Sequence, residues 1–258
     1  MNRFREMVAG FTRTFWVANA LELVERFAFY GAKAVLTIYL AERVGLGAQA
    51  AGTLAGVFSG VLYCLPILAG PVVDRYGFKK SLAACFSIFC VGYFLLGLAG
   101  MESGQEIVAV VGKGPYVLGV LLLTAIGGSL IKPCIVGTVA RTSAPSVKSL
   151  GYSIYYTLVN VGGAVGPILA LQVRESLGIE FVFVTSSIAS LACLIGTLIF
   201  FREPDREPGN EAPRSIVQVL RDAALVFRNF RFITFLIIFS GFWIMFWQIF
   251  YSLPFSLT

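Results

Sequence analysis

The chain has 258 residues, of which 57% are hydrophobic and only 13% are charged, and its formal net charge is +6. Soluble domains carry nearer a quarter of charged residues, and a mean hydropathy of +0.83 indicates an integral membrane protein. The positive charge does not indicate nucleic-acid binding, because the basic residues fall in short loops between apolar runs. His is absent and the five cysteines form no CxxC pair. The composition therefore argues against a disulfide framework and against a metal site.

Seven apolar runs are long enough to cross a bilayer as helices. In chain order they are expected at about 14–40, 50–73, 81–100, 115–140, 150–173, 180–201 and from 232 onward. The segments 41–49 and 101–114 are expected to be loops. The pattern predicts a six-helix transmembrane bundle over residues 1–201, a cytoplasmic linker at 202–230 and a seventh span at 231–258. The expected fold class is therefore an all-α polytopic membrane protein.

The first apolar run contains four ionisable residues near its middle, Glu22, Glu25, Arg26 and Lys33. Each costs on the order of 3 kcal/mol or more when buried unpaired in a bilayer, so the four should face one another or a wet cavity. Together with Phe29 and Tyr30 they recur at spacings of three and four and form one helical stripe. Two carboxylates and two cations can gain or lose a proton, which indicates a proton-coupled transport path. The alternative is a structural ion-pair cluster that holds helices together.

The segment 202–230 differs from the rest of the chain. Residues 202–210 are charged and broken by prolines, as in a linker. Next come an apolar stripe at helical spacing and Arg214, Arg221 and Arg228, which recur every seven residues. This pattern predicts an amphipathic helix on an anionic membrane surface. A plain solvated linker helix remains open as the alternative.

The loop charges predict the orientation of the chain in the membrane. The N-terminal arm and the loops after the second, fourth and sixth spans hold fourteen Lys and Arg, against three in the other loops. The N-terminus and the linker are therefore expected in the cytoplasm. Six spans, a long connection and a seventh span also resemble half of a carrier built from two similar halves. We expect a fragment whose C-terminal half is missing, with a complete seven-span protein as the alternative.

Small residues and prolines mark places where helices should pack closely or bend. Gly52–Gly56, Gly127–Gly128 and Gly162–Gly166 predict close helix–helix contacts. Three prolines lie inside predicted spans: Pro66, Pro133, which follows Lys132, and Pro167 in the fifth span. Because proline lacks a backbone N–H donor, they are expected to loosen or bend the helices.

Residues 70–80, GPVVDRYGFKK, resemble the GxxxDRxGRRR loop of the major facilitator superfamily. Asp74 and Arg75 lie at a predicted cytoplasmic helix end. A charge-assisted contact there could latch neighbouring helices in one access state and release them in the other. We predict that these two residues take part in gating.

A more specific resemblance is to the proton-coupled oligopeptide transporters. Residues 22–31 resemble the ExxERFxYYG signature of that family, and residues 128–133 resemble its GxGxxKPN segment. Residues 152–162 are similar to FSxFYxxINxG, and residues 63–66 to a YxxP element. The resemblance covers almost the whole chain, in the same order and spacing.

The resemblance implies roles for individual residues. Glu22 and Glu25 would handle the proton, with Arg26 as their charge partner. The residues implied for the peptide site are Tyr30, Lys33, Tyr63, Lys132, Asn160 and Trp243. Asn160 would hydrogen-bond the peptide backbone, the cations would meet its carboxylate, and Trp243 would be an apolar wall.

Four positions depart from the pattern of that family. Phe29 removes one hydroxyl of the YYG element, Lys33 replaces a usual Arg, and Cys134 replaces the Asn after KP. Trp247 stands where a Glu is expected to face the span-four lysine. Lys132 would then have to pair with Glu22, Glu25 or substrate, or lose its proton.

The favoured function is proton-coupled symport of di- and tripeptides by alternating access. The alternatives are a carrier of the same architecture for another small metabolite or drug, and a truncated, non-transporting membrane protein. An enzyme is not expected, and neither is a metal or any cofactor besides the coupling proton. The expected partners are short peptides, the lipid bilayer and the missing C-terminal half, with no nucleic acid. The expected location is the plasma (inner) membrane with the N-terminus cytoplasmic.

Overall fold

The computed structural model describes residues 8–205 and 216–251. The chain divides into two compact units, Met1–Asn210 and Glu211–Thr258. In the described residues helices follow one another, and the β contact found there is a single bridge between Phe11 and Ser143. The predicted all-α class is confirmed.

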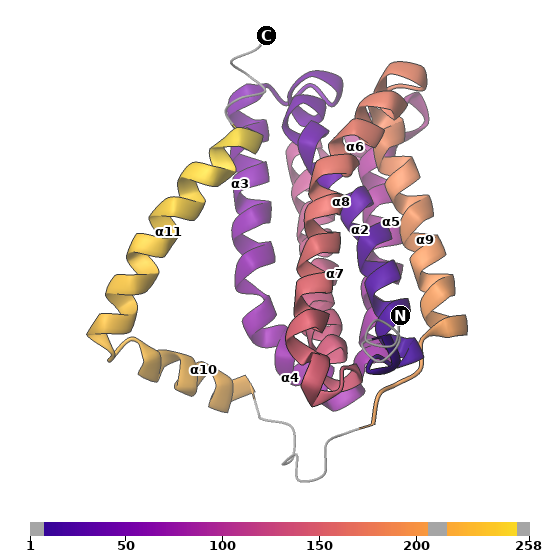
Figure 1. Cartoon of the computed structure of the whole chain (residues 1–258). Coiled ribbons are helices and arrows are strands. Elements are labelled where there is room, and N and C mark those ends of the chain that lie inside the picture. The colour runs from indigo at the N-terminus through magenta and orange to yellow at the C-terminus, as the bar shows by residue number, and fades with distance from the viewer. Residues whose placement is uncertain (1–7, 206–215, 252–258) are drawn as a thin grey trace. The chain divides into compact units, whose positions relative to one another are not determined.

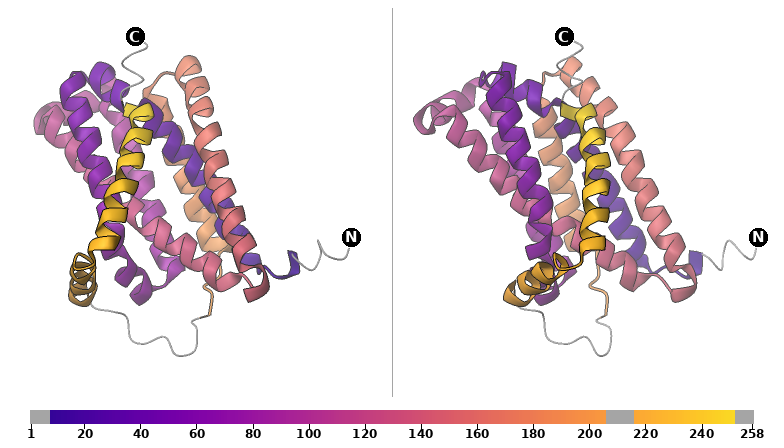
Figure 2. Two further views of the ribbon diagram at one scale, coloured as in Figure 1. Left: turned by 60° about the vertical axis from the view of Figure 1, so that its left-hand side comes forward. Right: turned by 90° about the vertical axis from the view of Figure 1, so that its left-hand side faces the viewer.

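The first unit is a bundle of long helices that run side by side (Figures 1 and 2). In chain order these are α2 (Arg13–Ile38), a π-helical turn (Tyr39–Arg43), α3 (Ala48–Cys64), α4 (Pro66–Tyr76), α5 (Phe78–Ala99), α6 (Gln105–Val111), α7 (Lys113–Thr142), α8 (Lys148–Ser176) and α9 (Glu180–Phe200). Helix α2 packs chiefly against α8 and α9, and α5 packs chiefly against α7 and α9. Because α2 has helices on several sides, the charged stripe of the first predicted span lies inside the bundle.

Helices α5, α7, α8 and α9 are each long and apolar enough to cross a membrane. Two bent pairs, α3 with α4 and α10 with α11, raise this number to six if each pair is counted as one span. Helix α2 has 26 residues, which is sufficient to cross a bilayer. Its charged residues make it too polar to be recognised by composition alone. The first predicted span therefore depends on the burial of those charges, which is described below.

Two expected features of the spans needed correction. The second predicted span is divided at Pro66 into α3 and α4, which are bent by 47° relative to each other. Proline cannot donate the helical hydrogen bond, which explains a break at this point. The stretch 101–114 is not all loop, because α6 lies within it. Helices α7 and α8 continue through Pro133 and Pro167, so these prolines do not end a helix.

Glycines bring α2 and α8 into close contact. A Cβ atom added at Gly162 would lie 2.3 Å from the Cβ of Arg26, and one at Gly166 would lie 2.9 Å from the carbonyl oxygen of Phe27. Gly127 and Gly128 are equally crowded, by Ile88 and Leu62. Close packing is therefore confirmed for these two predicted glycine faces. It is wrong for the face of Gly52 and Gly56, where an added Cβ would meet nothing within 4 Å among the described atoms.

Glu203, just after α9, caps the first turn of α5. Its Oε1 and Oε2 accept hydrogen bonds from the backbone N–H groups of Phe78 and Lys79, each at 2.7 Å. Gly77, with φ +86°, precedes this turn, and a Cβ there would lie 2.8 Å from Glu203 Oε1. A carboxylate at a helix N-terminus satisfies free N–H groups and interacts favourably with the helix dipole. The contact therefore ties the segment after α9 to the start of α5, next to the end of α4 that contains Asp74.

We expect Glu203→Ala to lower the free energy of unfolding by about 1–2 kcal/mol, the usual cost of losing a helix cap. The measurement is thermal or denaturant unfolding of the purified protein in one detergent. Asp205→Ala is the matched control, because Asp205 is an exposed carboxylate two residues further along the chain. Equal stability of the two variants would contradict a capping role for Glu203.

The second unit contains α10 (Ile216–Val226) and α11 (Phe230–Tyr251). Helix α10 coincides with the predicted amphipathic segment, and Arg221 and Arg228 are exposed. Arg214, which was placed on the same stripe, lies outside the described residues. The seventh predicted span corresponds to α11, which begins two residues earlier than expected. Attachment of α10 to an anionic membrane surface remains a prediction.

Candidate functional site

The centre of the candidate site is the charged stripe of α2. Glu22 is 0% exposed, Glu25 2%, Arg26 6% and Lys33 5%. Burial on this scale is costly for charges in a bilayer unless they interact with one another. The helical spacing places all four on the side of α2 that the rest of the bundle covers.

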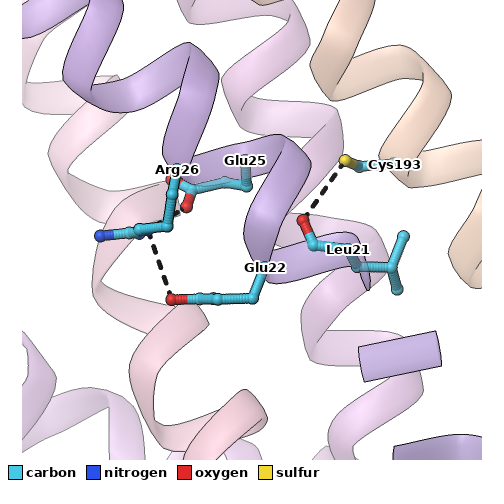
Figure 3. Close-up of polar contacts among 5 residues, drawn as sticks. All are labelled: Leu21, Glu22, Glu25, Arg26 and Cys193. Atoms are coloured by element: carbon cyan, nitrogen blue, oxygen red, sulfur yellow. Dashed lines mark hydrogen bonds and ion pairs between the residues drawn. The ribbon is translucent and has the colours of Figure 1, made fainter. Parts of the chain in front are cut away.

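Arg26 interacts with both carboxylates (Figure 3). Its Nε lies 2.5 Å from Glu25 Oε2 and 3.3 Å from Glu22 Oε1. The guanidinium carbon also lies 4.9 Å from the centre of the Phe29 ring and 5.8 Å from that of Tyr30. One cation therefore holds two acids together, with aromatic rings beside its charged group. The prediction that Arg26 is the charge partner of Glu22 and Glu25 agrees with this geometry.

Lys33 lies about two turns further along α2 and is directed to different neighbours. Its Nζ is 5.7 Å from the ring centre of Phe29 and 5.5 Å from that of Tyr63 on α3. Cations over aromatic faces at this range gain electrostatic stabilisation. Two residues of the predicted peptide site, Lys33 and Tyr63, therefore lie together, and Phe29, the departure from the expected Tyr, lies between Lys33 and Arg26.

Lys132 reaches the same charges from α7. It interacts electrostatically with Glu22, Glu25 and Arg26, but its side chain is exposed. Among the described residues it makes no ion pair within 4.0 Å. Lys132 therefore faces the carboxylates without being engaged by them in this structure. Of the alternatives that the sequence left open for Lys132, a direct ion pair with Glu22 or Glu25 is absent among the described residues, and pairing with substrate or loss of the proton stay predictions.

The remaining predicted binding residues lie on α2, α8 and α11. Tyr30 is half-buried, and its ring would be 3.7 Å from a Cβ at Gly163 of α8. Asn160, also on α8, is exposed. Trp243 lies on α11 of the second unit and is 39% exposed. The side chain of Trp247 lies outside the described side chains. The first unit thus contains every predicted site residue except Trp243.

Two contacts that the sequence analysis missed hold α2 against α9. The thiol of Cys193 donates to the carbonyl oxygen of Leu21 at 3.7 Å (Figure 3), and Ser186 Oγ donates to that of Ala28 at 3.3 Å. Tyr155 of α8 is a third missed residue, because it is 2% exposed and interacts with Glu22. Small polar residues on apolar helices do indicate helix–helix contacts in the sequence. Their spacing, however, does not show which neighbouring helix each one contacts.

Comparison with known proteins shows which family the sequence resembles. The family profile of the Major Facilitator Superfamily matches residues 20–258. The chain belongs to the Major Facilitator Superfamily. Its relatives include the dipeptide and tripeptide permease B of Photorhabdus asymbiotica, 26% identical over 204 residues, which are 77% of this chain and 39% of the relative. The protein of the same name from Salmonella typhimurium is 24% identical over 207 residues, 76% of this chain and 40% of that one. The chain thus spans about 40% of the length of the curated relatives it matches.

Solved structures of similar fold include further transporters. The POT family transporter PepTSo has a TM-score of 0.64 and 21% identity, over 77% of this chain and 40% of that one. A POT family transporter in complex with 5-aminolevulinic acid has a TM-score of 0.65 and 20% identity, over 90% of this chain and 47% of the other. Together with the permease relatives, these structures confirm the predicted resemblance to oligopeptide transporters. The chain is an integral membrane protein whose relatives are transporters.

The loop typical of the Major Facilitator Superfamily forms a small cavity in this chain. Asp74 and Arg75 are exposed at the end of α4. A cavity of about 300 Å³ there is lined by Gly70, Val73, Asp74, Phe78, Pro133, Gly137, Ala140, Arg141 and Lys148. Arg141 lies over the Phe78 ring, 4.6 Å from its centre. Asp74 therefore lines the same cavity as Arg141 of α7 and Lys148 of α8. From the sequence, these two cations had served only to predict the orientation of the chain.

Proposed function

We propose that this protein belongs to a carrier that moves short peptides across a membrane by alternating access, driven by protons. The observation that supports this most is the buried group of Glu22, Glu25 and Arg26 inside a membrane bundle. Titratable groups at membrane depth are the usual elements of proton relays in transporters. The permease names of the relatives support the substrate class.

Two carboxylates that share one cation can bind and release a proton with a small change in free energy. When both are ionised, the Arg26 charge is divided between them; adding a proton to either one leaves a balanced pair of one acid and one cation. The proton therefore changes how strongly Arg26 is held. This change is a way to couple proton binding to substrate binding.

Lys33 and Lys132 are the proposed anchors for the substrate carboxylate. Lys33 is held by aromatic rings, and Lys132 is exposed and faces the acids. Neutralising Glu22 or Glu25 weakens their attraction on Lys132 and leaves it to bind the carboxylate of a peptide. Tyr30, Tyr63 and Asn160 would line the peptide path, and Trp243 would provide an apolar wall.

The proposed transport cycle needs a gate as well as a binding site. Asp74 and Arg75 at the end of α4 are the proposed gating pair, because Asp74 lines a cavity shared by several helix ends and Arg75 is the next residue. A contact there that forms in one access state and breaks in the other would favour one direction of opening. We also propose a plasma (inner) membrane location with the N-terminus in the cytoplasm, and the proton as the sole coupling ion.

The test is peptide uptake into proteoliposomes by the protein expressed from its complete natural gene. Under an imposed inward proton gradient, we expect dialanine uptake that collapses when the gradient is dissipated. In Glu25→Gln, proton-driven uptake should fall at least about tenfold, since general acid–base groups contribute effects of this size or more. Glu106→Gln, which removes an exposed carboxylate of α6, is the control and should transport normally.

Competition separates the peptide carrier from its alternatives. Excess di- and tripeptides should inhibit uptake, whereas single amino acids should not. Uptake that only other metabolites inhibit would replace peptides by those compounds. Unchanged proton-driven uptake in Glu25→Gln would remove the proposed coupling mechanism.

A further inference from the structure

Tyr155 is a buried tyrosine of α8 for which the proposed function has no role. It is 2% exposed. In the pattern FSxFYxxINxG, given above, the tyrosine position corresponds to Tyr156 and the position before it is Phe. This chain therefore has an additional hydroxyl at residue 155, whereas Phe29 lacks a hydroxyl on the facing helix α2. Tyr156, in contrast, is 61% exposed.

The register of α2 and α8 places Tyr155 beside Glu22. Near its start α8 contacts α2 at Gly151, where an added Cβ would be 3.3 Å from the Phe15 ring, and further along at Gly162, which meets Arg26. The two helices therefore run in the same direction, and Tyr155 lies opposite Asn19, one turn before Glu22. Helical side chains lean toward the N-terminus of their helix. The side chains of Tyr155 and Glu22 lean the same way, and the two groups interact across this offset of about one turn.

Glu22 needs a hydrogen-bond donor at this depth. The residue is 0% exposed, and neither of its carboxylate oxygens has a hydrogen bond in the described part of the chain. Its contact with Arg26 Nε is 3.3 Å, while the same nitrogen lies only 2.5 Å from Glu25. Leaving a buried carboxylate without donors is costly. Arg26 therefore pairs more closely with Glu25 than with Glu22.

Six other titratable groups interact electrostatically with Glu22. They are Glu25, Arg26 and Tyr30 on α2, Cys85 on α5, Lys132 on α7 and Cys193 on α9. Lys132 is exposed, and the Cys193 thiol is occupied by the Leu21 carbonyl. The Tyr155 side chain interacts with Glu22 and has no other hydrogen bond among the described residues. A phenol both donates to an ionised carboxylate and accepts from a protonated one.

We propose that the Tyr155 hydroxyl is the hydrogen-bond partner of Glu22 and sets the pH at which Glu22 takes up its proton. This inference rests on the proposed function, because it assigns a positioning residue to its proton site. With Tyr155 as partner, Glu22 and Glu25 differ: Arg26 lies closer to Glu25, and Glu22 has a neutral hydroxyl in addition to its longer contact with Arg26. The two acids are then distinct proton sites, and Glu22 is the one that is tuned from α8.

The experiment compares Tyr155→Phe with Tyr152→Phe, a half-buried tyrosine one turn earlier on α8. Infrared difference spectra of the purified protein, with Glu22→Gln as reference, isolate the carboxyl band of Glu22. In Tyr155→Phe we expect this band to move to higher frequency and its pH midpoint to rise by about one unit, because the ionised form loses a donor. Tyr152→Phe should leave both unchanged. Melting temperatures within a few degrees of each other would show that the variants are folded.

Transport provides the second measurement. The pH profile of proton-driven dialanine uptake should move in the same direction in Tyr155→Phe, while peptide exchange at equal pH on both sides stays within about twofold of the parent. If no peptide is transported by the parent, the proposed function fails, but the infrared result still decides the hydrogen bond. An unchanged Glu22 band and midpoint in a folded Tyr155→Phe variant would overturn the proposal and leave Tyr155 a packing residue.

Discussion

Arg26→Met is expected to lower the free energy of unfolding by about 3–5 kcal/mol, the cost of removing one partner from a buried charge pair. The substitution preserves much of the side-chain volume but leaves Glu22 and Glu25 without their cation, at exposures of 0% and 2%. Denaturant unfolding in detergent micelles measures the effect. The deficit should be smaller near about pH 5 than near about pH 8, because protonation removes the uncompensated charge.

A triple variant separates the charge from the loss of contacts. Replacing Glu22 and Glu25 by Gln in the Arg26→Met background removes all three charges at once. Neutral replacement of a buried charge cluster is often close to neutral in stability, so the triple variant should recover at least half of the lost stability while remaining inactive in proton-driven uptake. A triple variant no more stable than Arg26→Met would mean that packing, and not charge, determines the cost.

Gly162→Ala is expected to lower the free energy of unfolding by about 1–3 kcal/mol, the usual cost of overpacking. An added Cβ would lie 2.3 Å from the Cβ of Arg26. That atom is attached directly to the α2 backbone, so it cannot rotate away and the helices must separate. Since Arg26 is displaced as well, proton-driven uptake should fall with stability. Melting temperature and uptake measure the two effects.

Gly163→Ala is the matched control for this prediction. It makes the same chemical change one residue along the same helix, where the nearest atom, in the Tyr30 ring, is at an ordinary distance of 3.7 Å. Its stability should stay within about 0.5 kcal/mol of the parent. Equal effects of the two substitutions would show that helix propensity, and not the contact between α2 and α8, is responsible.

The sequence determined the type and approximate position of the long helices because membrane helices follow a local rule. About 20 apolar residues must occur together to cross a bilayer, so the apolar runs predicted the long helices within a few residues. The spacing of Glu22, Glu25, Arg26 and Lys33 placed them on one side of α2, since angular position on a helix depends only on residue number. Pro66 marked a real break for an equally local reason, its missing backbone donor.

What only the tertiary structure decided is which groups meet across helices. Helical spacing favours a pair of Arg26 with Glu22, four residues earlier, yet Arg26 is closer to Glu25, and Tyr155 of α8 interacts with Glu22. Similarly, two glycine faces with the same sequence character differ, because Gly162 meets Arg26 while Gly52 meets no described atom. In lipid the hydrophobic effect does not choose helix neighbours, so these pairings depend on the shape of small-residue contacts and on the few available polar partners. That information is spread over helices far apart in the chain, which is why the sequence pattern predicted the charged stripe but not its partners.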